Sequence, residues 1–258
     1  MTASGSMMKA DGTMTMSPGL TKLSHRMASR NGCRSMTAII TRAMPAAAKL
    51  QCFKVRIDNI SVTNEFRASN GVKWTVPFSP GVFVVTDKSD PLAALGAPDR
   101  KQGLRALSED GDPTPLAAYV ESAYPGSGAF LVRVGGSKPK GILPGEAFEF
   151  FVVAQPAQRL YIATMHGQSN DWSYGTPSGI ALFDANGKAV GGDATAAVKL
   201  YDVGTEADQE LGIGSTQGPR QPHPRYGPPD ADPRVTLATS DSRFVDASKV
   251  MRVTVTPQ

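Results

Sequence analysis

The feature that most constrains the fold is a strict alternation of apolar and polar residues that begins after Cys52. Phe53, Val55 and Ile57 are apolar, whereas the residues between them are charged. Because successive side chains of a strand point to opposite faces, this period of two predicts a half-buried strand. Similar short apolar runs recur at residues 81–85, 130–134, 148–153, 160–165, 180–183, 198–201, 235–237 and 250–255. Turn-forming residues separate most of these runs, which predicts an all-β protein, an antiparallel sandwich or barrel.

Two stretches depart from this pattern. Residues 102–123 do not alternate, and Thr114 followed by Pro115 fits an N-cap and a first helical position. We therefore expect one or two short helices there, inserted between strands and lying over one edge of the fold. Residues 212–232 are rich in proline and glycine and are expected to form a long loop.

The first 52 residues differ in composition from the rest of the chain. They contain seven Lys or Arg, one acid and eight of the ten methionines, but no aromatic residue. Such a segment cannot bury enough apolar surface to offset the entropy of ordering it. We expect residues 1–50 to be a disordered leader and residues 51–258 to form one domain. Two interpretations of the leader stay open: a processing or signal segment, or a start codon assigned too far upstream.

The charge distribution argues against nucleic-acid binding. The chain carries +4, but residues 53–258 contain 20 basic and 22 acidic side chains, and phosphate binding requires a basic surface. No apolar run approaches the roughly 20 residues of a membrane helix, so we expect no transmembrane segment. Two cysteines, Cys33 and Cys52, establish no disulfide framework and cannot supply the four ligands of a structural zinc site.

Catalytic signatures are absent from the sequence. No serine lies in a nucleophile-elbow pattern, and the glycines lack the context of a nucleotide-binding loop. His166 follows an apolar run, where a structural role at a turn or sheet edge is the simpler interpretation. Besides a binding module, two alternatives stay open: a hydrolase that uses His166 with nearby acids, and a purely structural domain.

Carboxylates that follow the apolar runs are candidate metal ligands. Asp171 follows one such run, and Asp202, Glu206 and Asp208 follow another. Loop carboxylates at strand ends can converge on one ion, and Ca²⁺ takes six to eight oxygen ligands in irregular geometry. Acids after strands also form simple turns, and spacing alone favours turns over a metal site.

Two other groups of residues are assigned structural roles. Glu109, Asp110 and Asp112 fall between the expected helices and are interpreted as a helix end and a capping turn. Trp74 and Trp172 are expected to be core anchors.

Five segments, in order along the chain, resemble the spondin N-terminal domain family, which includes domains of F-spondin and mindin and many bacterial proteins. They are residues 53–61, 79–85, 103–112, 169–172 and 201–206. The resemblance covers essentially the whole chain after the leader. It implies an antiparallel β-sandwich similar to calcium-dependent lipid-binding domains, an extracellular setting, adhesion or ligand binding without catalysis, and a bound Ca²⁺.

The resemblance also implies particular ligands. Asp171 of the Asp-Trp motif and Asp202 of the Asp-x-Gly-Thr motif match calcium ligands, and Glu206 replaces an Asp that often follows that Thr. Ser173 stands where animal members usually have an aromatic residue, and the family's disulfide cysteines are missing, so the animal partners are not carried over. We therefore expect a secreted or periplasmic, non-catalytic adhesion module that holds Ca²⁺ and recognises an extracellular or cell-surface ligand.

Overall fold

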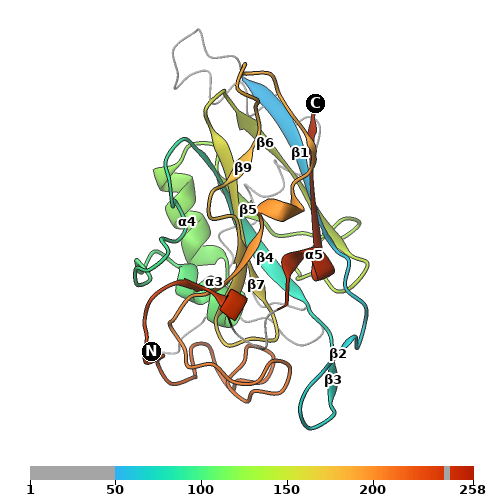
Figure 1. Ribbon diagram of the computed structural model, residues 1–258, viewed down its shortest axis with the longest axis vertical. Helices are drawn as coiled ribbons and strands as arrows, with labels where there is room; N and C mark the ends of the chain where they lie inside the picture. Colours follow the sequence, from blue (N-terminus) through green and yellow to red (C-terminus); the bar gives the residue numbers. More distant parts are fainter. Residues whose placement is uncertain (1–49, 241–244) are drawn as a thin grey trace.

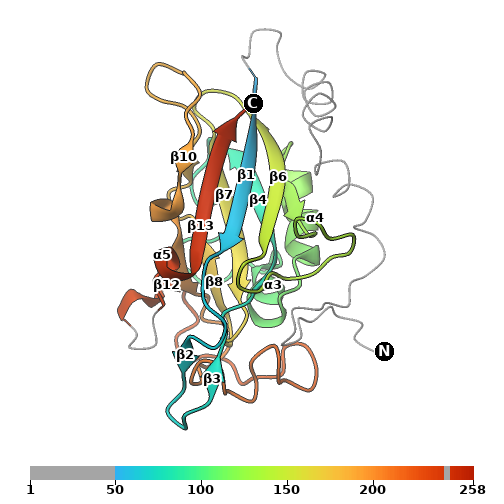
Figure 2. The same ribbon diagram turned by 90° about the vertical axis from the view of Figure 1, so that its right-hand side faces the viewer.

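Two antiparallel β-sheets form the frame of the protein (Figures 1 and 2). The computed structural model describes residues 50–240 and 245–258. One sheet has four strands, in the order β10 (Gly192–Asp193), β13 (Met251–Pro257), β1 (Gln51–Asn59) and β6 (Ala147–Ala154). The predicted all-β, antiparallel sandwich-like fold is therefore confirmed.

The second sheet has seven strands. Its order is β12 (Thr236–Leu237), β11 (Lys199–Asp202), β8 (Trp172–Gly175), β7 (Arg159–His166), β4 (Phe78–Thr86) and β5 (Gly128–Phe130), with β9 (Ile180–Ala181) paired to β7. A small hairpin of β2 (Phe66–Arg67) and β3 (Lys73–Trp74) projects at the lower end of the molecule in Figure 1.

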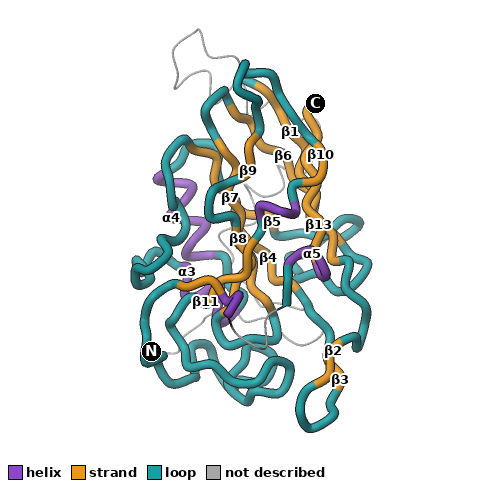
Figure 3. Tube along the Cα trace, viewed as in Figure 1, coloured by secondary structure: helices purple, strands orange, loops and turns teal. Residues whose placement is uncertain are grey.

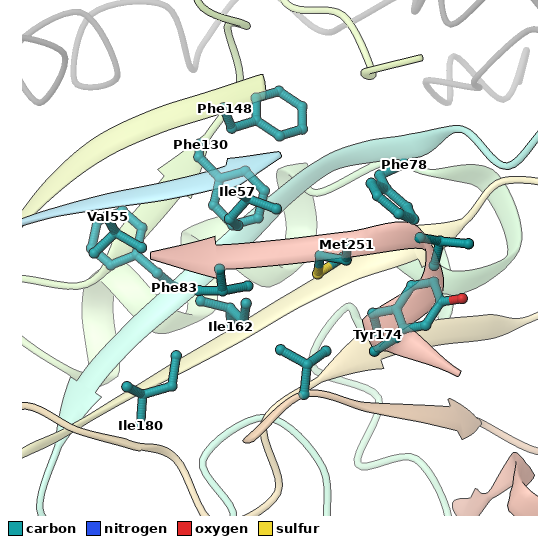
Figure 4. Close-up of a cluster of buried hydrophobic side chains, with 14 of the residues drawn as sticks. Val55, Ile57, Phe78, Phe83, Phe130, Phe148, Ile162, Tyr174, Ile180 and Met251 are labelled. Carbon is teal, nitrogen blue, oxygen red and sulfur yellow. The ribbon is translucent and has the colours of Figure 1, made fainter. Parts of the chain in front are cut away.

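The main core lies between the two sheets, and β1 shows how the sequence builds it. Phe53, Val55 and Ile57 are fully buried, while the charged residues between them are partly exposed. Figure 4 shows side chains from the opposite sheet, including Phe83 and Ile162, facing this row. The alternation in the sequence is therefore the inward and outward alternation of a strand with one face on the core.

A second core covers the other face of the seven-stranded sheet. Helices α3 (Leu104–Asp110) and α4 (Thr114–Ala123) pack Leu107 and Leu116 against the β4 residues Val82 and Val84. Every residue of β4 is consequently buried. The two expected helices are present, but they cover a sheet face rather than an edge, because β4 is apolar on both sides. Thr114 is already helical, and Pro113 holds the N-cap position.

Shorter elements complete the described chain. The one-turn helix α5 (Ala247–Val250) begins at Asp246, whose carboxylate accepts a hydrogen bond from the Ser248 amide. Two 3₁₀ turns are η1 (Thr195–Ala197) and η2 (Ala238–Ser240). The segment between β11 and β12 contains no helix or strand, which confirms the predicted long loop (Figure 3).

Other expectations meet the structure only in part. The expected leader, residues 1–50, lies outside the described residues apart from Leu50. Cys52 is disulfide-bonded, and the other cysteine in the sequence, Cys33, lies outside the described residues. Both tryptophans are buried, as predicted. In the described ranges, no helix has the length and apolarity needed to cross a membrane.

Candidate metal-binding site

Two of the three predicted ligands lie side by side at one end of the seven-stranded sheet. Asp171 immediately precedes β8, and Asp202 is the last residue of β11. These strands pair antiparallel, with Asp202 opposite Trp172. Residues 31 positions apart in the sequence are therefore brought to neighbouring places by the strand register.

Asp171 has the most unusual environment of the three. Its side chain is fully buried. One oxygen, Oδ2, accepts hydrogen bonds from the Thr205 amide at 2.6 Å, the Thr205 hydroxyl at 3.2 Å and the Glu206 amide at 3.1 Å. The other oxygen, Oδ1, is buried without a hydrogen-bond partner among the described residues. A buried acceptor without a partner is costly, which makes this oxygen a candidate for contact with a cation.

Negative charge accumulates around Asp171. Burial raises the pKa of Asp171 well above its usual value, and the neighbouring carboxylates of Asp202 and Asp208 raise it further, against the opposing amide hydrogen bonds. Asp208 Oδ2 accepts a hydrogen bond from the Trp172 indole at 3.1 Å, and Asp202 Oδ1 accepts one from the Gly204 amide at 2.8 Å. Three carboxylates near one buried position favour either a proton or a cation.

Glycine at position 204 is required by the turn that follows Asp202. Gly204 has φ of 70°, and a Cβ there would lie 2.7 Å from the Arg234 carbonyl oxygen. The loop can therefore fold back over its own return segment only without a side chain at this position. This close approach sets the position of Thr205 and its contact with Asp171.

Glu206, the third predicted ligand, points its carboxylate elsewhere. Its Oε1 accepts a hydrogen bond from the Asn170 side chain at 3.0 Å, and its Oε2 is buried without a partner among the described residues. Burial raises the pKa of Glu206, with further contributions from Glu109 and Asp110. Only the backbone amide of Glu206 contacts Asp171. The structure thus brings Asp171 and Asp202 together, adds Asp208, and leaves Glu206 beside a second acidic group.

That second group includes the acids at the end of α3. Glu109 is fully buried and accepts a hydrogen bond from Arg105 Nε at 2.7 Å, while its Oε2 has no partner among the described residues. Asp110 Oδ1 accepts hydrogen bonds from the Gln221 side chain and the Arg225 amide. The helix ends at Gly111 in a left-handed conformation, as the sequence predicts. The burial of both acids under the long loop was not predicted.

His166 lies in an apolar setting. It is fully buried at the end of β7, with its ring 5.9 Å from that of Trp74 and 5.8 Å from that of Tyr174. Burial lowers the pKa of His166 to about 4. Its Nδ1 accepts a hydrogen bond from the Gln168 amide, and its Nε2 contacts no nucleophilic side chain among the described residues.

In the part of the chain that the structure describes, no group of three or more His, Cys, Asp or Glu side chains converges closely enough to hold a metal ion as it stands.

Comparisons with known proteins add no assignment. A scan against models of known protein families found no match, and a search of curated proteins found no significant match. Functional reasoning on this chain therefore depends on the geometry of its own residues.

Proposed function

We propose that the protein is a secreted, non-catalytic binding module of the spondin N-terminal type whose loops around Asp171 and Asp202 bind Ca²⁺. The observation that carries the proposal is the state of Asp171. Three donors from the loop that follows β11 hydrogen-bond to one carboxylate oxygen, and the other oxygen is buried without a partner among the described residues. An oxygen in this state matches a carboxylate oriented by the protein toward a cation.

The chemistry of the surrounding groups suits a hard cation. Asp202 and Asp208 are close enough to Asp171 to raise its pKa, and carboxylate oxygens are the ligands that Ca²⁺ prefers. Glu206 would join them only if its side chain turned away from Asn170. Binding an ion would draw these loop carboxylates together, relieve their repulsion and stiffen the loop that follows β11.

Two observations support an extracellular binding role over a hydrolase. Cys52 is disulfide-bonded, and disulfide bonds persist mainly in oxidising compartments. His166, the candidate base of a hydrolase, packs against the rings of Trp74 and Tyr174, and its Nε2 has no hydrogen-bond partner in the part of the chain that the structure describes. The resemblance to the spondin family points to adhesion or ligand recognition.

Calcium titration of the full chain tests the proposal. We expect calorimetry to detect binding and the free energy of unfolding to rise with free calcium, by about 2.7 kcal/mol at a hundredfold excess over the dissociation constant, since only the folded chain has the site. A chain that gives no heat and the same melting temperature in calcium and in EDTA would instead be a structural domain.

The variant Asp171→Asn separates ion binding from the loop contacts. Its amide oxygen can keep the hydrogen bonds from Thr205 and Glu206, while the negative charge is lost. We expect at least tenfold weaker calcium binding, with unchanged or higher stability in EDTA, because a buried charge is removed. Asp202→Asn should weaken binding less. Asp184→Asn, in an exposed turn, is the matched control and should leave calcium binding unchanged. Full binding by Asp171→Asn would refute the site.

A further inference from the structure

A cavity of about 640 Å³ lies beside the candidate calcium loop, between the first turns of α3 and α4 and the long loop after β11. Its size is within the range of roughly 300–1,000 Å³ that small-molecule sites occupy. Gly204 and Thr205 form part of its wall. The residue that holds Asp171 on one side therefore faces the cavity on the other.

Three basic side chains line this cavity: Lys101, Arg105 and Arg225. The ammonium of Lys101 and the guanidinium of Arg225 have no hydrogen bond or ion pair with the described residues. Arg105 uses only Nε, which donates to Glu109 at 2.7 Å. This bond orients the guanidinium and leaves its two terminal nitrogens available. The wall therefore carries three positive charges, which Asp99 and Asp230 on the same wall and the buried Glu109 offset in part.

The backbone at two of these positions is strained. Lys101 has φ of 60° and Arg225 has φ of 57°, a region that favours glycine and asparagine. They are two of the five non-glycine residues with positive φ in the described chain. Residues held in unfavourable backbone conformations concentrate at ligand sites. Two of the three basic residues therefore stand at constrained backbone positions on one cavity wall.

The positive charges of Arg105 and Arg225 both affect the buried carboxylate of Glu109. Both lower the pKa of Glu109, so both positive charges lie near that buried carboxylate. Two guanidinium groups so placed, one already oriented, suit a carboxylate, because the planar fork of arginine matches a carboxylate in two parallel hydrogen bonds.

The remaining polar residues of the cavity wall include hydrogen-bond acceptors, which a ligand with donor groups would satisfy. Asp99 and Asp230 line the cavity with carboxylates, and Gln102 adds a further polar group. The apolar wall consists chiefly of prolines, and the cavity lining contains no aromatic side chain on which a planar base or ring could stack. A ligand with hydroxyl groups as well as a carboxylate meets these requirements better than an aromatic one.

We propose that this cavity binds a sugar acid, a polyhydroxylated ring whose carboxylate contacts Arg105 and Arg225 and whose hydroxyls donate to Asp99. The proposal deepens the binding role proposed above by naming the ligand class of the module. It does not depend on calcium, because none of the three basic residues is a candidate calcium ligand.

Calorimetry on the full chain with trigalacturonate tests this inference. The titration is run in EDTA, so that the affinity of the saccharide for calcium does not contribute. We expect trigalacturonate to bind and the neutral trisaccharide maltotriose not to bind at the same concentration. Arg225→Gln should weaken binding about tenfold, since a charge-assisted contact is lost. Lys101→Gln should act in the same direction. Arg252→Gln, on the exposed side of β13, is the charge-matched control and should change binding less than twofold.

Several results would overturn the inference: no binding of trigalacturonate at millimolar concentration, equal binding of maltotriose, no effect of Arg225→Gln, or tighter binding of a triglutamate peptide, which would assign the cavity to acidic peptides. The calcium titration separates this failure from that of the proposed function. If the full chain fails to bind the saccharide but still responds to calcium, only the sugar-acid site is refuted.

Discussion

At the scale of single residues, the protein concentrates buried acids at one end. Glu109, Asp110, Asp171 and Glu206 are each at most 2% exposed. Burying a carboxylate is unfavourable unless it is paired or protonated. Among the described residues, the one ion pair made by these four acids joins Glu109 to Arg105. The stability of this end is therefore expected to depend on pH.

Asp110→Asn tests this dependence. Burial raises the pKa of Asp110 to about 6, and the neighbouring Glu109 raises it as well. The folded-state pKa of Asp110 lies above the unfolded value. The protonated carboxyl therefore stabilises the folded state below about pH 4, and this stabilisation is lost as pH rises through 6. Asparagine keeps an acceptor oxygen for Gln221 and for the Arg225 amide. In EDTA we expect the variant to match wild type near pH 4 and to exceed it at pH 7 by up to about 3 kcal/mol.

Urea denaturation at the two pH values measures this difference. Asp184→Asn, which removes a carboxylate from an exposed turn, should show no such gain at pH 7. An Asp110→Asn protein that is less stable than wild type at pH 7 would show that the charged form is the favoured one in the folded state.

The positions of Asp171 and Asp202 follow from the sequence to the extent that both flank strands. Their proximity does not, because it requires the register of β8 against β11. The direction of Glu206 was not predictable either. Its side chain is held by Asn170, a residue from a different loop, and such a contact leaves no periodic signal. For the same reason the sequence shows Asp110 as a turn residue and does not reveal its burial.

At the scale of elements, strands that coincide with an apolar run were predictable, including the short β9, β11 and β12, and strands without such a run were not. β1, β6, β7 and β13 follow their apolar runs closely. β8 was missed because it has only four residues: Trp172 and Tyr174 alternate with Ser173 and Gly175, but so short an alternation carries little signal. β2, β3 and β10 have two residues each and carry too little pattern for any prediction.

Gly81→Ala tests the packing of the central strand β4. A Cβ at this position would lie 2.2 Å from the Ala163 carbonyl oxygen of β7 and 2.4 Å from the Phe130 ring of β5. Backbone in a ladder can move little, so we expect a loss of about 3 kcal/mol in the free energy of unfolding. Gly96→Ala is the control, because no atom lies within 4 Å and only its positive φ opposes the change, at about 1 kcal/mol. Equal losses at the two positions would mean that β4 has room to shift.

At the scale of the whole molecule, the two cores share the seven-stranded sheet. β4 contributes Phe83 and Val85 to the core between the sheets, and Val82 and Val84 to the core under the helices. Neither core can open without exposing a face of this strand. Unfolding is therefore expected to be a single cooperative transition.

The composition of the first residues bears on what they contribute to stability. The described strands extend from Gln51 to Pro257. We expect deletion of residues 1–49, combined with Cys52→Ser to remove the unpaired thiol, to change the melting temperature by no more than a few degrees relative to full-length Cys52→Ser, because the composition of this segment predicts little burial of apolar surface. Cys52→Ser in the full chain is the control for the disulfide bond. A truncated chain that fails to fold would move the domain boundary upstream.

The hydrogen bond between the Trp172 indole and Asp208 has an optical consequence. The indole is fully buried, and its N–H donates to a carboxylate of the acidic loop. Indole emission responds to charge and motion in its immediate surroundings, so a rearrangement that moves Asp208 is expected to change the emission of Trp172. The chain has one other tryptophan, Trp74, which stacks on Phe66 in the small hairpin. With Trp74 replaced by phenylalanine, the protein reports on its own acidic loop by fluorescence, without an added label.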